Sequence, residues 1–144
     1  MKPKLYFAAP LFSQAERTFN VMLEAHLSET FDVFLPQRDN HLFVELVASG
    51  LSIEAAQQRV FDGDLDAIEG SDVLLMVLDG RCIDEGACFE LGFAYAMHKT
   101  CIGLQTDPRR LLPIGNNPMI ERALSKSFQT VEELLHWARQ PDFN

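Results

Sequence analysis

The chain alternates between short apolar runs and longer segments with helical periodicity, and this alternation restricts its possible folds more than any other feature. Apolar runs cover residues 5–9, 31–35, 73–78 and 100–105, and helical patterns cover residues 13–27, 52–70, 86–99 and 130–139. Strands that alternate with helices form parallel sheets covered by helices on both faces. We therefore expect an α/β fold, a flavodoxin-like three-layer sandwich with a five-stranded, mostly parallel sheet.

The length of 144 residues matches one domain, for which about 100–200 residues is usual, and we expect residues 1–144 to form a single domain. Hydrophobic residues make up 47% of the chain, enough for a full core. No apolar run approaches the roughly 18 residues of a membrane span, and no signal-peptide pattern precedes the first strand. The three cysteines form no CxxC pair, which favours a reducing compartment. We expect a cytoplasmic protein.

Charge and missing motifs exclude several classes of function. The formal net charge of −9 disfavours nucleic acid as a partner, because phosphate binding requires a basic surface. The four histidines are scattered without HExxH spacing, so no metal site is indicated. Dinucleotide, P-loop and nucleophile-elbow motifs are missing too. A neutral small molecule is the ligand that best fits this composition.

Glu90 is the first candidate for chemistry. It is the only charged side chain in residues 86–97, a helical pattern that follows the apolar run 73–78. A helix N-terminus favours an ionised carboxylate by roughly 0.3–1 kcal/mol. Parallel α/β proteins bind ligands beyond the carboxyl ends of their strands. Glu90 is therefore predicted to be an ionised nucleophile; the alternative is an ordinary surface glutamate in the first turn of a helix.

Asp64 is the second candidate. It shares one helical face with Val60, Phe61, Ala67 and Ile68, so it lies within an apolar stripe. Burial raises the pKa of a carboxyl group, and a protonated Asp64 would act as an acid. The alternative is a position at the edge of the stripe, where Asp64 reaches solvent or caps a loop. Two carboxylates in different environments are what glycosidic chemistry with retention uses.

The chain resembles the nucleoside 2-deoxyribosyltransferase family in short motifs spread over most of its length. They are Tyr6-Phe7-Ala8-Ala9-Pro10-Leu11-Phe12, Leu35-Pro36-Gln37-Arg38-Asp39, Asp62-Gly63-Asp64-Leu65, Asp84-Glu85-Gly86 with Glu90-Leu91-Gly92-Phe93-Ala94, and Asn116-Asn117-Pro118-Met119-Ile120. The resemblance implies a glycosyltransferase (pentosyltransferase) of nucleotide salvage that moves the 2-deoxyribosyl group of a 2′-deoxynucleoside to another nucleobase. It implies retention of the β-configuration, no metal or organic cofactor, and nucleosides and nucleobases as partners, with no nucleic acid or membrane.

The resemblance also implies roles for individual residues. Glu90 matches the nucleophile that attacks C1′ and forms a covalent glycosyl-enzyme intermediate. Tyr6 matches the tyrosine that orients this nucleophile, and Asp64 the acid that contacts and protonates the base. Asp84 matches a sugar-hydroxyl ligand, although an Asp just before a helix is also a common cap. Tyr6 has the alternative of being an ordinary core residue.

Further candidates for substrate binding follow from the same resemblance. Asn117 matches a sugar-binding asparagine that a neighbouring subunit donates, with Met119 beside it, and this implies a homo-oligomer with sites shared between subunits. Taken alone, Asn117 is also a plain turn residue before Pro118. Gln37 and Asp39, from the second motif, are predicted to bind substrate as well.

Two other functions remain as alternatives. One is an N-glycosidase that hydrolyses (deoxy)nucleosides or nucleoside 5′-monophosphates. For monophosphates it needs a phosphate cradle after the first strand, where this chain offers only Ser13 and Arg17 in residues 10–17. The other is a non-catalytic nucleoside-binding sensor. Two buried carboxylates argue against the sensor, because burying them costs free energy that a passive binder has no use for.

Overall fold

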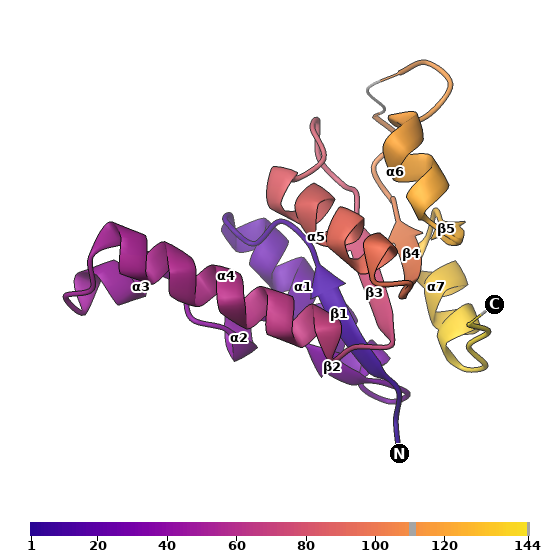
Figure 1. Ribbon diagram of the computed structural model, residues 1–144. Helices are drawn as coiled ribbons and strands as arrows, with labels where there is room; N and C mark the ends of the chain where they lie inside the picture. Colours follow the sequence, from indigo (N-terminus) through magenta and orange to yellow (C-terminus); the bar gives the residue numbers. More distant parts are fainter. Residues whose placement is uncertain (110–111, 144) are drawn as a thin grey trace.

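Five parallel strands form one sheet in the order β2-β1-β3-β4-β5 (Figure 1), in a computed structural model that describes residues 1–109 and 112–143. The strands are β1 (Lys4–Ala8), β2 (Asp32–Phe34), β3 (Val73–Val77), β4 (Thr100–Leu104) and β5 (Lys126–Phe128). Each neighbouring pair of strands is parallel. The predicted flavodoxin-like α/β architecture is confirmed, and the sheet is parallel throughout rather than for the most part.

Helices cover both faces of the sheet and complete three layers. They are α1 (Gln14–Leu27), α2 (Pro36–Asp39), α3 (Phe43–Ala48), α4 (Ile53–Glu69), α5 (Glu85–Ala96), α6 (Pro118–Ala123) and α7 (Val131–Ala138). One core joins the sheet to α1 and α7 through Leu23, Leu27 and Leu134. The opposite core joins it to α4 and α5 through Ile68 and Leu91. Figure 1 shows α4 and α5 in front of the sheet. No helix within the described ranges is long and apolar enough to cross a membrane.

Side-chain caps mark the starts of the long helices. The Ser13 hydroxyl accepts from Glu16 N at 3.1 Å while the Glu16 carboxylate accepts from Ser13 N at 2.7 Å, which closes a capping box. Ser52 caps α4 in the simpler way, with its hydroxyl alone. At the start of α7 only half of a capping box forms. Thr130 caps the helix, but the Glu133 carboxylate accepts from Gln129 N instead of the cap residue.

Two segments differ from the sequence-based expectation. The segment after the second apolar run, where the sequence showed no helical pattern, contains the single-turn helix α2 (Pro36–Asp39). Asp39 stabilises this turn, because its carboxylate accepts from Leu35 N at 2.8 Å. The fifth strand, which the expected sheet required but no pattern located, is β5. It is three residues long and pairs only with β4.

Candidate active site

Tyr6 and Glu90 meet between the central strand β1 and helix α5. The Tyr6 hydroxyl donates a hydrogen bond to Glu90 Oε1 at 2.9 Å, and the tyrosine side chain is fully buried. Tyr6 is paired with Phe34 on β2, and their rings stack with centroids 5.6 Å apart. A buried hydroxyl without a partner costs about 1–3 kcal/mol. Glu90 therefore satisfies the tyrosine, and the tyrosine in turn fixes the orientation of the carboxylate.

Asp64 belongs to the same cluster, as its position in the apolar stripe of α4 predicted. Burial raises the pKa of Asp64, and hydrogen bonding to Asn40 and Tyr6 opposes that rise. The charges of Glu90 and Asp64 both act on Tyr6 and, together with burial, hold its pKa well above the ordinary value. Tyr6 thus stays a protonated donor between two acids. The structure brings together the three residues that the sequence singled out for catalysis.

The pKa of Glu90 depends on more than its place near the N-terminus of a helix. Burial, and then the nearby charge of Asp64, raise the pKa of Glu90 from 4.5 to about 8, although the Tyr6 hydrogen bond lowers it. Such a shift disfavours the charged form by roughly 4–5 kcal/mol, whereas a helix N-terminus favours it by only about 0.3–1 kcal/mol. Burial therefore opposes the ionised form of Glu90 that the sequence led us to expect, and the role of Glu90 as an ionised nucleophile stays a prediction. The two carboxyl groups titrate as a coupled pair.

This shift makes stability depend on pH. The folded state holds the Glu90 proton more tightly than an unfolded chain does, where glutamate titrates near pH 4.3. The resulting stabilisation is complete below that pH and is lost as the pH rises through about 8. The Gln side chain of Glu90→Gln cannot ionise. Between pH 5 and pH 9 we therefore expect the free energy of unfolding of the variant to rise by roughly 2–4 kcal/mol relative to that of the wild type.

Urea unfolding of both proteins at pH 5, 7 and 9 measures this difference. Glu85→Gln removes an exposed acid from the first turn of the same helix and is the matched control, expected to follow the wild type. Parallel pH profiles for the wild type and Glu90→Gln would contradict a buried Glu90 with a raised pKa.

Asn40 is a residue of this cluster that the sequence-based reasoning missed. Its Nδ2 donates to Asp64 Oδ1 at 2.8 Å and to the Val60 carbonyl at 3.0 Å. It approaches α4 at Gly63, where a Cβ atom would lie only 2.5 Å from Asn40 Oδ1. The signal in the sequence was a glycine inside a helical pattern, which often marks such a close approach.

Asp84 caps helix α5 and still lies close to the cluster. Its Oδ2 accepts from Ala87 N at 2.9 Å, which is the capping role considered from the sequence. Its charge contributes to the raised pKa of Glu90, so the two acids are near each other. Within the described residues its other carboxylate oxygen accepts no hydrogen bond. A sugar-binding role for Asp84 stays a prediction.

Gln37 and Asp39 make contacts that hold α2 in place. The Gln37 amide accepts from Asn20 Nδ2 at 2.9 Å and donates to the Arg17 carbonyl at 3.1 Å, which ties α2 to α1. Asp39 pairs with Arg38 at 2.7 Å in addition to its bond within α2. Neither residue has a hydrogen bond to Tyr6, Asp64 or Glu90 among the described residues. Their role as substrate ligands stays a prediction.

Asn117 and Met119 lie at the start of α6. The Asn117 side chain caps the helix by accepting from Met119 N at 2.9 Å. Both residues line a cavity of about 330 Å³ together with Ile83 and Cys88. Neither Glu90 nor Asp64 lines this cavity. One subunit therefore does not join Asn117 to Glu90 in this cavity. In the part of the chain that the structure describes, no group of three His, Cys, Asp or Glu side chains is arranged to hold a metal ion.

Comparison with known proteins finds solved structures of similar fold. A conserved protein from Enterococcus faecalis V583 has a TM-score of 0.81 at 26% identity, covering 97% of this chain and 99% of that one. A 2-deoxyribosyltransferase from Bacillus psychrosaccharolyticus has a TM-score of 0.76 at 23% identity, covering 97% and 93%. The CMP N-glycosidase BcmB from Clostridium botulinum has a TM-score of 0.60 at 17% identity, covering 92% and 96%.

No curated protein matches the sequence. The structures from Bacillus psychrosaccharolyticus and Clostridium botulinum show likeness of fold. The family model of nucleoside 2-deoxyribosyltransferase matches residues 5–135, a span that contains Tyr6, Asp64, Glu90 and Asn117. The chain belongs to the nucleoside 2-deoxyribosyltransferase family.

Proposed function

We propose that this protein transfers 2-deoxyribosyl groups between nucleobases through a covalent intermediate on Glu90. The observation that carries the proposal is the 2.9 Å hydrogen bond from buried Tyr6 to Glu90, in a cluster that includes a second acid, Asp64. An oriented carboxylate beside an acid with a raised pKa is suited to retaining glycosyl transfer. Membership of the family supports nucleosides as the substrate class.

Glu90 and Asp64 have different roles in the steps of the proposed transfer reaction. Ionised Glu90 attacks C1′ of the nucleoside, and the bond from C1′ to the base nitrogen breaks. The electron pair of that bond leaves with the base, which takes a proton from Asp64. A second base then attacks C1′ from the side that the first one left, the ester bond to Glu90 breaks, and the incoming base gives its N–H proton to Asp64. Two inversions retain the β-configuration. Tyr6 donates to Glu90 and holds it in line with C1′.

Hydrolysis of nucleoside 5′-monophosphates is the weaker candidate, because both residues available for a phosphate cradle are already engaged. The Arg17 guanidinium donates to the carbonyls of Leu11 and Phe12, at 3.3 and 2.6 Å. The Ser13 hydroxyl caps α1. A phosphate would have to displace these contacts, and a net charge of −9 gives no compensating attraction.

Incubation with deoxyinosine, with and without adenine, separates the candidate functions. Transfer produces deoxyadenosine only when adenine is present. An N-glycosidase that acts on nucleosides releases free 2-deoxyribose in both tubes. A binding protein without activity produces neither, and so does an N-glycosidase restricted to nucleoside 5′-monophosphates. Deoxyadenosine formation is the expected result. Its absence, in either of the other two patterns, would refute the proposed transferase.

We extend the proposal to an oligomer whose sites are shared. Ile114 is 97% exposed and Met119 79% exposed, both next to Asn117. On the same face of the sheet, Phe61 of α4 and Phe89 of α5 pack together with ring centroids 5.8 Å apart yet stay exposed. Exposed apolar groups of this kind mark interaction surfaces, which supports placing Asn117 in a neighbour's site.

Mixing two impaired variants tests whether sites are shared between subunits. Glu90→Ala subunits lack the nucleophile, and Asn117→Ala subunits lack the proposed sugar ligand. If a site draws Glu90 from one subunit and Asn117 from another, some mixed oligomers contain an intact site. We expect activity above that of either parent after subunit exchange, measured as deoxyadenosine formed. With exchange verified and both parents impaired, no recovery would place the two residues in the same subunit's site.

Gly63→Ala separates the positioning of Asp64 from stability. Alanine favours a helix interior by about 1 kcal/mol relative to glycine, which offsets part of the clash with Asn40. The displaced Asn40 amide no longer donates to Asp64. We expect near-wild-type stability and a transfer rate roughly 10- to 100-fold lower, because small misplacements of catalytic groups have effects of this size.

Initial rates and thermal unfolding measure the two effects. Gly92→Ala in α5, where nothing lies within 4 Å of an added Cβ, is the matched control. It should gain stability without losing activity. A Gly63→Ala protein with full activity would show that the contact between Asn40 and Asp64 does not matter for the reaction.

A further inference from the structure

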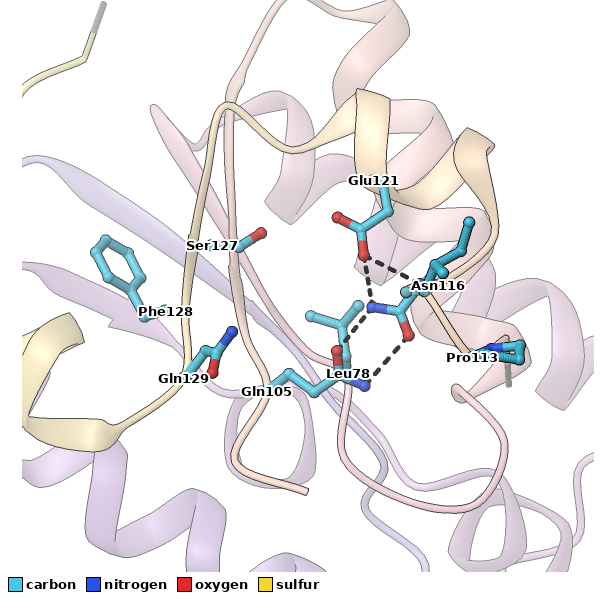
Figure 2. Close-up of a pocket in the computed structure, with 10 residues that line it drawn as sticks. Leu78, Gln105, Pro113, Asn116, Glu121, Ser127, Phe128 and Gln129 are labelled. Carbon is cyan, nitrogen blue, oxygen red and sulfur yellow. Dashed lines mark hydrogen bonds between the residues drawn. The ribbon is translucent and has the colours of Figure 1, made fainter. Parts of the chain in front are cut away.

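The segment that carries Asn117 runs between two cavities. One, of about 390 Å³, is lined by residues that include Pro113, Gly115 and Glu121, and is shown in Figure 2. The other is the cavity of about 330 Å³ that Asn117 itself lines. Gln105 and Asn116 line both cavities, so these two side chains form the wall between them. A cavity removes packing contacts from its lining, and packing alone therefore holds this segment weakly.

Hydrogen bonds among Gln105, Asn116 and Glu121 hold the segment before Asn117 in place. Asn116 Nδ2 donates to Gln105 Oε1 at 2.7 Å and to Glu121 Oε1 at 2.8 Å, and Gln105 Nε2 donates back to Asn116 Oδ1 at 3.3 Å. The backbone N–H of Asn116 adds a bond to Glu121 Oε1 at 3.2 Å. Figure 2 shows the three side chains converging, without a bond to Gln129 on the same cavity.

Burial gives this network a single preferred geometry. Gln105 is 7% and Asn116 8% exposed, so water cannot replace a lost partner easily. Each buried polar group left without a partner costs about 1–3 kcal/mol. Gln105 is itself tied to the sheet, because its backbone N–H donates to the Phe128 carbonyl at 2.9 Å. The network thus anchors Asn116 to the carboxyl end of β4.

Two residues of the network, Asn116 and Glu121, flank the proposed substrate ligands Asn117 and Met119 in the sequence. Asn116 directly precedes Asn117, and Glu121 lies in α6, one turn after it. Gly115, with φ of +144°, reverses the chain just before this point, a conformation that glycine adopts most readily. Only Asn117, Pro118, Met119 and Ile120 lie between the two anchored residues, so their position follows from the network.

We propose that the Gln105–Asn116–Glu121 network positions Asn117 and Met119, and thereby decides whether the glycosyl-enzyme reacts with a nucleobase or with water. This inference rests on the proposed function. With the turn in place, the site excludes water, and a base attacks C1′. With the turn displaced, water attacks C1′ of the ester, which releases free 2-deoxyribose and returns the Glu90 carboxyl group. Asn116 is a positioning residue and touches no reacting atom.

The test measures how products divide between transfer and hydrolysis. Deoxyinosine and adenine are incubated with wild type, Asn116→Leu, Asn117→Ala and the double variant, and deoxyadenosine and free 2-deoxyribose are quantified. We expect Asn116→Leu to lower the ratio of transfer to hydrolysis about tenfold or more. The double variant should be no worse than Asn117→Ala, because residues acting through one another are not additive. Asn116→Asp, which keeps the shape and loses the donor, replaces Asn116→Leu if that variant does not fold.

Two control variants distinguish positioning from a general loss of structure. Gln129→Leu removes an amide from the same cavity outside the network and should leave the ratio unchanged. Glu121→Gln keeps an acceptor for Asn116 and should retain the ratio within about twofold. An unchanged ratio in folded Asn116→Leu, or additive losses in the double variant, would overturn the proposal.

Backbone hydrogen exchange in residues 117–121 provides a readout that does not need activity. Met119 N donates to Asn117 Oδ1 and Ile120 N to the Asn117 carbonyl, both at 2.9 Å. We expect faster exchange at these amides in Asn116→Leu and no change in Gln129→Leu. If the wild type neither transfers nor hydrolyses, the proposed function fails, and the partition role fails with it. Faster exchange would then still support the anchoring of the turn, and unchanged exchange would overturn that as well.

Discussion

A folded Glu90→Ala protein should form no measurable deoxyadenosine and no free 2-deoxyribose from deoxyinosine. The variant lacks the carboxylate that bonds to C1′, and losing a nucleophile commonly lowers the rate by about 10⁴-fold or more. The fold should persist, since the same change removes a buried acid that is costly to ionise. Initial rates and circular dichroism measure the two outcomes.

A second variant, Glu90→Gln, separates the loss of the nucleophile from a change in the geometry of the site. Glutamine still accepts the hydrogen bond from Tyr6, so the site keeps its geometry while the nucleophile is lost. Glu85→Ala, an exposed acid on the same helix, is the matched control and should keep its activity. Mass spectrometry of the wild type with excess deoxyinosine should detect a protein heavier by one deoxyribosyl group, and Glu90→Gln should lack it. Near-wild-type rates in either folded Glu90 variant would rule out the mechanism.

Asp64→Asn should slow the reaction by about 10²–10⁴-fold for a base that leaves poorly, such as adenine. Asparagine can donate a hydrogen bond but cannot give up a proton at useful pH. Bases that leave well need less protonation, so the reaction rate with these bases should fall less in Asp64→Asn. A panel of donor nucleosides measures this dependence, and Asp66→Asn, an exposed acid two residues later in α4, is the control. An equal loss for all bases would mean that Asp64 positions the substrate without protonating the base.

Local patterns in the sequence were enough to predict the parallel core of the fold. The central strands β1, β3 and β4 are almost continuous apolar runs, because helices bury both of their faces. Ser13 and Ser52 marked two helix starts, because capping depends on residues only three positions apart. Strand β5 could not be located, since three residues carry no periodicity and pair only with the exposed edge of β4.

The candidate acids were also visible in the sequence, as charges in otherwise apolar segments, but their environments were not. Whether Glu90 is ionised depends on how completely Tyr6, Asp64 and the sheet enclose it, and these neighbours come from distant parts of the chain. The contact of Asn40 with Asp64 likewise joins α4 to the loop after α2. The sequence by itself determined the α/β architecture and the identity of Glu90 and Asp64, because both follow from local periodicity. Only the tertiary structure decided their protonation and their partners, because desolvation and hydrogen bonding depend on groups that only folding brings together.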